Sequence, residues 1–410
     1  MKKLSLSTKI LIALICGIIA GIFLQGAPDF ANGYIKPFGT LFLNLIKLIV
    51  VPLVFASLVV GTTGLGDIKK IGRIGGKTLA YYLLTTAFAV ILGLILANVL
   101  NVGSGYTIPV DAAVEAREIP KIADTLLGII PTNPVKALVD GNMLQIIVFA
   151  IMLGGSIMAI GEKGESLERG INSLAEAMYK MTAAIMQFAP YGVFALITPV
   201  VAENGPSVLL PLFKVIFVVY LGCILHMVLV YSGTLRIFAN FSPIKFFKLI
   251  SPAQIFAFTT ASSSATLPIN MKCAESMGVP NHISSFVLPL GATVNMDGTA
   301  LYQGVCAFFI AQVYGLDLTI AQQITIVLTA TLASIGTAGV PGAGLIMLTM
   351  VLQSVGLPLE GLALIAGIDR VLDMARTCVN ITGDTACAVI IAASEKELDR
   401  NVTTSNTASM

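Results

Sequence analysis

Long apolar runs separated by short polar connections make up most of the chain. Six such runs occupy its first part, at about residues 8–26, 38–66, 78–102, 142–161, 182–203 and 207–233. A helix of about 20 residues crosses the hydrocarbon core of a bilayer. A membrane-spanning strand would instead alternate apolar and polar positions over about ten residues. The pattern therefore predicts an all-α polytopic membrane protein rather than a barrel.

Two later apolar stretches are interrupted in the middle by small and polar residues. The first, from about 245 to 277, is broken at Ser262, Ser263, Ser264 and Pro268. The second, about seventy residues later, is broken at Ser334, Gly336, Thr337, Gly339, Pro341, Gly342 and Gly344. Each half is too short to cross a membrane, so each stretch is predicted to be a helical hairpin with its tip inside the bilayer. Non-helical backbone at that depth must be buried in protein or line a cavity. A pair of interrupted segments is a typical mark of a transporter's binding site.

The composition excludes a soluble globular protein. Of the 410 residues, 56% are hydrophobic and 11% are charged, whereas soluble domains have about 25% charged residues. The net charge of +2 does not indicate a partner, and the sequence has no basic cluster that would suggest nucleic acid. Six scattered cysteines without a C-x-x-C pair, and only two histidines, argue against a zinc site or a disulfide framework. The lipid bilayer is the partner that this composition predicts.

Lysine and arginine residues gather in alternate connections. They precede the first apolar run, follow the second, fourth and sixth, and occur again at Lys396 and Arg400 near the end of the chain. Connections rich in these residues face the cytoplasm. Both termini are therefore predicted to lie on the cytoplasmic side of a plasma or inner membrane.

A dense polar stripe lies within the last apolar stretch, in the segment DRVLDMARTCVNITGD from Asp369 to Asp384. At about 100° per helical residue, six polar side chains fall within one stripe about 100° wide. They are Asp369, Asp373, Arg376, Thr377, Asn380 and Asp384. A charge at mid-bilayer costs at least about 2.5–3.5 kcal/mol, so the stripe is expected to face a protein interior or a watery cavity. The alternative is a set of ion pairs with a purely structural role.

A second polar segment, NMDGT at residues 295–299, is predicted to break a helix. Asn295 and Asp297 offer side-chain oxygens, and the break would free carbonyls near Gly291 and Thr293. Hard cations take oxygen ligands, which discontinuous helices supply. The charged residues of the segment from Asp369 to Asp384, Arg370 included, together with Asp297 carry a net charge of −2, and buried charge must be neutralised. A bound cation is the predicted balance, and a polar kink without a ligand is the alternative.

The motifs SSSATLP, NMDGTALYQGV, SIGTAGVPGAG and LDMARTCVNITGD together resemble the glutamate transporter family of dicarboxylate/amino acid:cation symporters, particularly its archaeal sodium–aspartate members. The resemblance covers nearly the whole chain. It implies a homotrimer whose protomers each have eight transmembrane helices and two re-entrant hairpins in inverted repeats. It also implies a scaffold of residues 1–77 and 142–206, and a moving transport domain of residues 78–141, 207–244 and 245–410.

The same resemblance implies the ligands, an acidic amino acid (aspartate or glutamate) and sodium ions. Arg376 would bind the side-chain carboxylate of the substrate and Asp373 its ammonium group. The substrate site would be completed by Thr299, Thr377, Asn380, the Ser263 region, and the backbone of Val340 and Gly344 as a lid. One sodium site would comprise Gly291, Asn295, Asn380 and Asp384. A second would comprise Thr293 with the carbonyls of Ser334, Ile335 and Thr337. A third would comprise Tyr82, Thr85, Thr86, Asn295 and Asp297.

The chain departs from the archaeal pattern in two places. Archaeal members have arginine just before the serine triplet, where this chain has Ala261, and here an arginine stands at Arg370 instead. This exchange changes how Asp373 is neutralised. Thr86 replaces a more usual serine, which conserves the hydroxyl group.

Three alternative functions would each require different residues. An intramembrane enzyme would need a nucleophile–base pair or a metal motif, and neither His226 nor His282 is expected near the stripe. A passive channel would favour rings of like charge over a mixed stripe. A sodium- or proton-coupled C4-dicarboxylate carrier of the same family would leave Asp373 without an amine to bind. Asp384, where proton-coupled relatives tend to have asparagine, favours sodium. The chain is therefore expected to be a sodium-coupled symporter of an acidic amino acid and not an enzyme.

Overall fold

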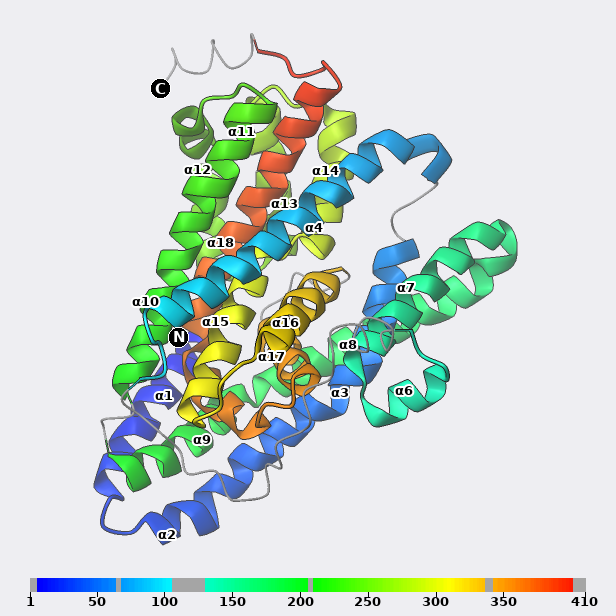
Figure 1. The fold of residues 1–410 in the computed structure, drawn as a ribbon. Coiled ribbons are helices and arrows are strands. Elements are labelled where there is room, and N and C mark those ends of the chain that lie inside the picture. Colours follow the sequence, from blue (N-terminus) through cyan, green and yellow to red (C-terminus); the bar gives the residue numbers. More distant parts are fainter. Residues whose placement is uncertain (1–5, 64–67, 105–129, 206–208, 336–341, 401–410) are drawn as a thin grey trace, which may run out of the picture.

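The computed structural model describes residues 6–63, 68–104, 130–205, 209–335 and 342–400, and all elements within these ranges are helices (Figure 1). The first half of the chain forms α1 (Leu6–Phe23), α2 (Pro28–Phe30), η1 (Ala31–Ile35), α3 (Lys36–Thr63), α4 (Ile68–Val99), α6 (Pro134–Asp140), α7 (Met143–Ile160), η2 (Gly161–Gly164), α8 (Glu165–Gln187) and α9 (Ala189–Asn204). The second half forms α10 (Leu209–His226), η4 (Met227–Tyr231), α11 (Ser232–Phe238), α12 (Pro243–Thr260), α13 (Ser263–Ser276), α14 (Asn281–Val294), α15 (Asp297–Val313), α16 (Ile320–Ala333), α17 (Ala343–Ser354), η5 (Leu359–Gly361) and α18 (Leu362–Ser394).

Several of these helices suit a membrane. Within the described ranges, five helical segments are long and apolar enough to span it: Pro28–Thr63, Arg73–Val99, Gln145–Gln187, Leu210–Phe238 and Leu359–Ser394. Shorter apolar helices are Thr8–Phe23, Ala189–Glu203, Ile320–Ala333 and Ala343–Ser354. The prediction of an all-helical protein with several apolar helices is confirmed. The number of eight spans stays a prediction.

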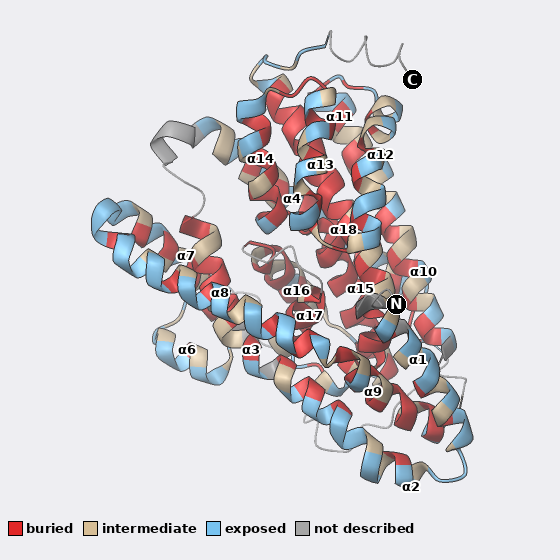
Figure 2. Cartoon of the chain, turned by 180° about the vertical axis from the view of Figure 1, so that it is seen from behind, coloured by how far each residue is buried: buried red, intermediate tan, exposed pale blue. Residues whose placement is uncertain are grey.

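Helix α18 occupies the centre of one bundle, against α10, α12, α13, α14 and α15 (Figure 1). Figure 2 shows it buried along most of its length, whereas α6, α7 and α8 expose much of their surface. The polar stripe therefore faces protein, as expected for charges at this depth. The apolar side of α18 is largely covered as well, with Leu372 and Val379 both fully buried.

A second group of helices packs along α3. Helices α7, α8 and α9 contact α3, and α1 lies against α9. Small residues allow the close approach of α1 to α9, because a Cβ atom on Gly17 would lie 2.5 Å from the side chain of Ile197. Helix α8 was not among the predicted apolar runs. It is amphipathic, with exposed Glu165 and Arg169 and buried Ile171, so its polar positions interrupt the apolar pattern.

The interrupted stretches fold into pairs of short helices. Helices α12 and α13 pack against each other, and they are separated by Ala261, whose φ of 49° is left-handed, and by Ser262. The Ser262 side chain caps α13 by accepting from the amide of Ala265. Helices α16 and α17, of 14 and 12 residues, also contact each other. The predicted break at NMDGT is confirmed, because α14 ends at Val294 and α15 begins at Asp297.

Ion pairs at the end of α18 tie this helix to α4. Glu395 follows α18 and is paired with Lys77, at 2.8 Å, and with Arg73 on α4. The hydrogen bond from Lys77 and the nearby Arg73 hold the pKa of the Glu395 carboxyl below its ordinary value. This contact fixes the end of the helix that carries Tyr82, Thr85 and Thr86.

Candidate functional site

Arg376 is fully buried in α18 and is held between two carboxylates of the same helix. Its Nη1 donates to Oδ1 of Asp369 at 2.9 Å, and its Nη2 donates to Oδ1 of Asp373 at 2.8 Å. Asp373 and Asp369 precede Arg376 by three and seven residues, and positions with these spacings lie on one face of a helix. The helical period therefore brings the three groups together. The trio carries one net negative charge.

The guanidinium group is enclosed by parts of two other helices. Its carbon lies 4.0 Å from the ring centroid of Tyr302 in α15, a cation–π arrangement. A Cβ atom on Gly344 of α17 would lie 2.6 Å from Nη1 and 2.7 Å from Nη2. Only glycine allows the backbone of α17 to approach Arg376 so closely. Gly344 therefore lies against Arg376, and its predicted part in a lid over the substrate stays a prediction.

Arg370 connects α18 to the turn between α12 and α13. Its Nη1 lies 3.7 Å from Oδ2 of Asp373, and its Nη2 donates to the carbonyl of Thr260 at 3.2 Å. Thr260 is the last residue of α12 and precedes Ala261. Asp373 thus has two arginines nearby, and its Oδ2 is also 3.4 Å from the amide of Gly342.

Asn380 links this acid–arginine group to the start of α15. Its Oδ1 accepts from the amide of Gly298 at 2.8 Å, and its Nδ2 lies 3.4 Å from the hydroxyl of Thr299. A Cβ atom on Gly298 would lie 2.4 Å from the carbonyl oxygen of Arg376, so α15 and α18 touch at their backbones here. Thr377, the remaining stripe hydroxyl, donates to the carbonyl of Asp373 at 2.9 Å.

One turn further along α18, a second group surrounds Asp384. Asn295 donates from Nδ2 to Oδ1 of Asp384 at 2.9 Å and to the carbonyl of Asn380 at 3.1 Å. The Oδ1 atom of Asn295 is buried without a hydrogen-bond partner among the described residues. A Cβ atom on Gly291 would lie 2.4 Å from Oδ1 of Asp384 and 2.6 Å from the hydroxyl of Tyr82. The end of α14 therefore borders a small cluster of oxygen atoms.

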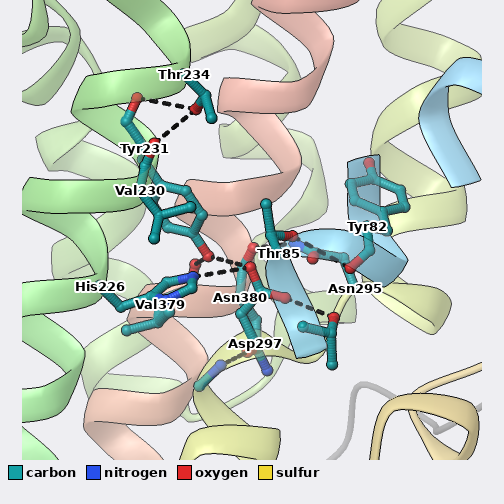
Figure 3. A network of polar contacts seen from close by, with 12 residues as sticks. Tyr82, Thr85, His226, Val230, Tyr231, Thr234, Asn295, Asp297, Val379 and Asn380 are labelled. Carbon is teal, nitrogen blue, oxygen red and sulfur yellow. Dashed lines mark hydrogen bonds and ion pairs between the residues drawn. The ribbon is translucent and has the colours of Figure 1, made fainter. Parts of the chain in front are cut away.

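Asp297 is the most thoroughly hydrogen-bonded carboxylate of the site (Figure 3). Thr86 on α4 donates to its Oδ1 at 2.6 Å, and Tyr231 donates to its Oδ2 at 2.8 Å. The Nε2 of His226 also lies 3.1 Å from Oδ2. Asp297, His226 and Tyr231 are all fully buried.

The donor set suits a hard cation. Among the described residues, neither Asp297 nor Asp384 pairs with lysine or arginine. The carboxylates, the unpartnered Oδ1 of Asn295 and the hydroxyls of Tyr82 and Thr86 are oxygen donors of the kind that alkali and alkaline-earth ions take. In the described ranges, no three His, Cys, Asp or Glu side chains form a metal-holding group. The residues fit a hard, oxygen-liganded cation.

Comparison with known proteins decides what kind of protein carries this site. The model of the sodium:dicarboxylate symporter family matches residues 6–394. The chain belongs to this family. The "Proton/sodium-glutamate symport protein" of Geobacillus stearothermophilus is 42% identical over 402 residues, which cover 96% of this chain and 95% of that protein.

Two further relatives in the sodium:dicarboxylate symporter family have different substrates in their names. The "Proton/glutamate-aspartate symporter" of Escherichia coli (strain K12) is 41% identical over 414 residues, 97% of this chain and 94% of that protein. The "C4-dicarboxylate transport protein" of Laribacter hongkongensis (strain HLHK9) is 35% identical over 404 residues, 96% of this chain and 90% of that protein. The resemblance to the glutamate transporter family is confirmed, and so is the expectation that the chain is not an enzyme. The likeness to archaeal members in particular stays a prediction.

The structure adds two residues that were not predicted to belong to the site of this symporter. His226 contacts Asp297, and neighbouring Tyr231 contacts Asp297 and also lies 3.2 Å from the carbonyl of Val379 in α18. The sequence offered a signal, since both residues interrupt a long apolar run. The contact with Asp297 could not be predicted, because the two residues precede NMDGT by about seventy residues in the sequence.

The remaining predicted residues differ in their burial and in their hydrogen-bond partners. Thr85 is buried and donates to carbonyls of its own helix, at Tyr81 and Tyr82. Ser263 is buried at the start of α13. Ser334 is buried and donates to the carbonyl of Thr331, and Ile335 is buried beside it. Thr293, however, is exposed and donates to the carbonyl of Leu290 in its own helix. Thr337 and Val340 lie outside the described residues, so the second predicted sodium site stays a prediction.

Proposed function

We propose that this chain takes up an acidic amino acid, aspartate or glutamate, together with sodium ions. The observation that carries the proposal is the buried Arg376 held between Asp369 and Asp373. Arginine presents a planar pair of donors that suits a carboxylate. Relatives named for glutamate and aspartate symport support the choice of ligand.

An amino acid fits this arrangement because it preserves the balance of charge. Binding of a substrate carboxylate to Nη2 of Arg376 would displace Asp373 from that nitrogen. Asp373 would then be a buried carboxylate without its partner, which is costly. The ammonium group of the same substrate supplies a replacement cation. In this proposal Thr299, Thr377, Asn380 and Ser263 contribute the remaining polar contacts, and the segment from Val340 to Gly344 covers the substrate.

Sodium is proposed to neutralise the carboxylates that have no arginine or lysine partner. Asp384, Asn295, Asn380 and Gly291 would hold one ion, and Asp297, Asn295, Tyr82, Thr85 and Thr86 another. Thr293, Ser334, Ile335 and Thr337 would hold a third. When bound, sodium supplies positive charge and accepts lone pairs from oxygen. The chain's own contribution is to bury the carboxylates and to link them to Arg376 through Asn380.

C4-dicarboxylate symport is the second candidate. Arg370 favours it, because its Nη1 lies 3.7 Å from Oδ2 of Asp373 and could neutralise that carboxylate without an amine. The relative named as a C4-dicarboxylate transport protein supports the same possibility. Coupling to protons rather than sodium is a variant of either candidate, since several relatives are named for both ions.

We further propose the architecture that such a transport cycle needs. The chain would form a homotrimer in the cell membrane, with both termini cytoplasmic, eight spans and two re-entrant hairpins, α12–α13 and α16–α17. Residues 1–77 and 142–206 would form a scaffold, and residues 78–141, 207–244 and 245–410 a moving transport domain. The short lengths of α16 and α17 and the grouping of α7, α8 and α9 along α3 support this division.

Asp373→Ala tests the substrate class. We expect aspartate affinity to fall about 10²-fold, because the amine loses a charged hydrogen-bond partner in a buried site. Succinate should bind as well as before or better, because repulsion from a carboxylate is removed. The measurement is calorimetric titration of the purified protein with aspartate, glutamate and succinate, with and without sodium.

Asp317→Ala, at an exposed aspartate between α15 and α16, is the matched control and should titrate like the wild type. If succinate already matches aspartate on the wild type, or if Asp373→Ala weakens both ligands equally, the dicarboxylate candidate replaces the amino acid. If neither ligand responds to sodium on any variant, the coupling ion is not sodium.

A further inference from the structure

A π-helical turn brings two polar side chains to Asp297. His226 is the last residue of α10, and Tyr231 ends the π-helix η4 that follows. In a regular α-helix, residues five positions apart point about 140° away from each other. A π-helix bonds residue i to i+5 and so returns that position toward the same side, and such turns are frequent at functional sites. The two rings are 4.9 Å apart and nearly perpendicular, at 87°.

Both side chains converge on one oxygen atom of the carboxylate. Tyr231 donates to Oδ2 of Asp297 at 2.8 Å, and the Nε2 of His226 lies 3.1 Å from the same atom (Figure 3). The other oxygen, Oδ1, faces Thr86 on α4. An ionised carboxylate only accepts hydrogen bonds, so this contact requires the form of His226 that carries a proton on Nε2.

Two donors on one oxygen fix the plane and direction of the carboxylate. With Oδ2 fixed, Oδ1 stays directed toward α4, where Thr86 lies. A carboxylate held in this way loses little further freedom when a cation binds to it, so less of the binding free energy is spent on ordering the ligand. The donors also satisfy the buried carboxylate when no cation is bound.

We propose that His226 and Tyr231 are positioning residues for the cation site at Asp297. They act on the ion through the carboxylate and set how tightly the protein holds sodium. The proposal rests on the proposed sodium coupling and adds to it two residues of α10 and η4. If their role were purely structural, the two residues would only hold η4 against α15 and α18, and replacing them would not change sodium affinity.

Sodium titration of four variants separates these roles. The melting temperature of purified protein in detergent, without substrate, is measured against sodium chloride, with choline chloride keeping the ionic strength constant. Tyr231→Phe removes only the hydroxyl, and we expect the half-saturating sodium concentration to rise about tenfold, the effect of losing a hydrogen bond to a charged group. Tyr81→Phe is the matched control, because the hydroxyl of the half-buried Tyr81 bonds Thr234 at 3.1 Å rather than Asp297. Its half-saturating concentration should stay within about twofold, because the donors to Asp297 are unchanged.

The histidine is tested by loss and rescue. His226→Leu should raise the half-saturating sodium concentration about tenfold, whereas His226→Gln, whose amide can donate to Oδ2, should stay within about threefold of the wild type. If His226→Leu does not fold, the sodium titration of Tyr231→Phe alone decides whether the pair has a positioning role.

The outcomes distinguish this proposal from the proposed function. A wild-type protein whose melting temperature is the same in sodium and choline contradicts sodium coupling, and the positioning role with it. A sodium-responsive wild type with an unchanged midpoint for Tyr231→Phe overturns the positioning role alone. The same conclusion follows if Tyr231→Phe only lowers the melting temperature in choline, or if Tyr81→Phe shifts the midpoint equally.

Discussion

Arg376 shows how one buried residue determines what its neighbours must do. An isolated guanidinium group inside a protein is strongly unfavourable, and it persists only with charged partners and additional contacts. Asp369 and Asp373 provide the charges, Tyr302 provides an aromatic face, and Gly344 leaves room for the group. The same features that stabilise the arginine also prepare it to exchange one carboxylate for another.

Replacing Arg376 tests that exchange at the level of the residue. We expect Arg376→Ala to reduce the affinity for acidic amino acids by about 10²–10⁴-fold, because breaking a buried charge pair costs about 3–5 kcal/mol. Arg376→Lys should keep the charge but not the two-pronged contact, so it should also bind poorly while folding better than the alanine variant. Titration calorimetry and melting temperatures measure both effects.

Arg370→Lys is a useful comparison, because Arg370 donates to a backbone carbonyl on α12 and lies further from Asp373. It should change substrate affinity far less than Arg376→Lys. Binding within a few-fold of the wild type after Arg376→Ala would mean that the arginine is structural.

The polar residues of α18 could be predicted because helical period alone places them on one stripe. Asp369, Asp373 and Arg376 do form the predicted group. The position of Thr293 could not be predicted in this way. It belongs to the last turn of α14, just before the break, where a one-residue change in helix end decides between an exposed and an inward side chain.

At the level of elements, the site residues depend most on the positions where helices are interrupted. The NMDGT break was predictable from its composition, since glycine and polar residues are unfavourable within a helix. The π-helical turn at η4 was not, because the apolar residues around it suit α- and π-helical backbone equally. The sequence reveals His226 and Tyr231 only as polar residues in an apolar run, and their common target lies about seventy residues away.

Gly291, at the end of α14, tests the break as a cation site. A Cβ atom there would lie 2.4 Å from Oδ1 of Asp384 and 2.6 Å from the hydroxyl of Tyr82. Gly291→Ala should therefore displace the oxygen atoms and raise the half-saturating sodium concentration by about tenfold or more, since ligands must be held within about 0.5 Å of the productive geometry. The measurement is the sodium dependence of amino acid binding.

Gly155→Ala is the matched control for that substitution. Gly155 lies within helix α7, and a Cβ atom there meets nothing within 4 Å. It should leave the sodium dependence unchanged and stabilise the helix slightly, because alanine favours helix over glycine. Equal sodium dependence in both variants would place the cation away from α14.

On the scale of the whole molecule, the sequence predicted the all-helical class and the order of apolar segments well. It missed α8, whose amphipathic pattern does not resemble a span. Subunit number and the motion of one domain against another concern surfaces whose partners the chain's own pattern does not specify. Both are proposals here, supported by membership of the family and, for the motion, by the packing of the helices.

A pair of cysteines across the proposed boundary tests the motion. Gly367 on α18 faces α1, because a Cβ atom there would lie 2.9 Å from Cδ1 of Leu14. Leu14 belongs to the proposed scaffold and Gly367 to the proposed transport domain. In a background without the six native cysteines, L14C with G367C should form a cross-link on oxidation, and uptake into vesicles should then fall at least about tenfold, because the two domains can no longer move apart. A reducing agent should restore it.

The control pair, G17C with I197C, joins α1 to α9 within the scaffold, where a Cβ atom on Gly17 would lie 2.5 Å from Ile197. Cross-linking this pair should leave uptake unchanged. If both cross-linked proteins transport normally, α1 moves together with α18 and the boundary between the domains lies elsewhere.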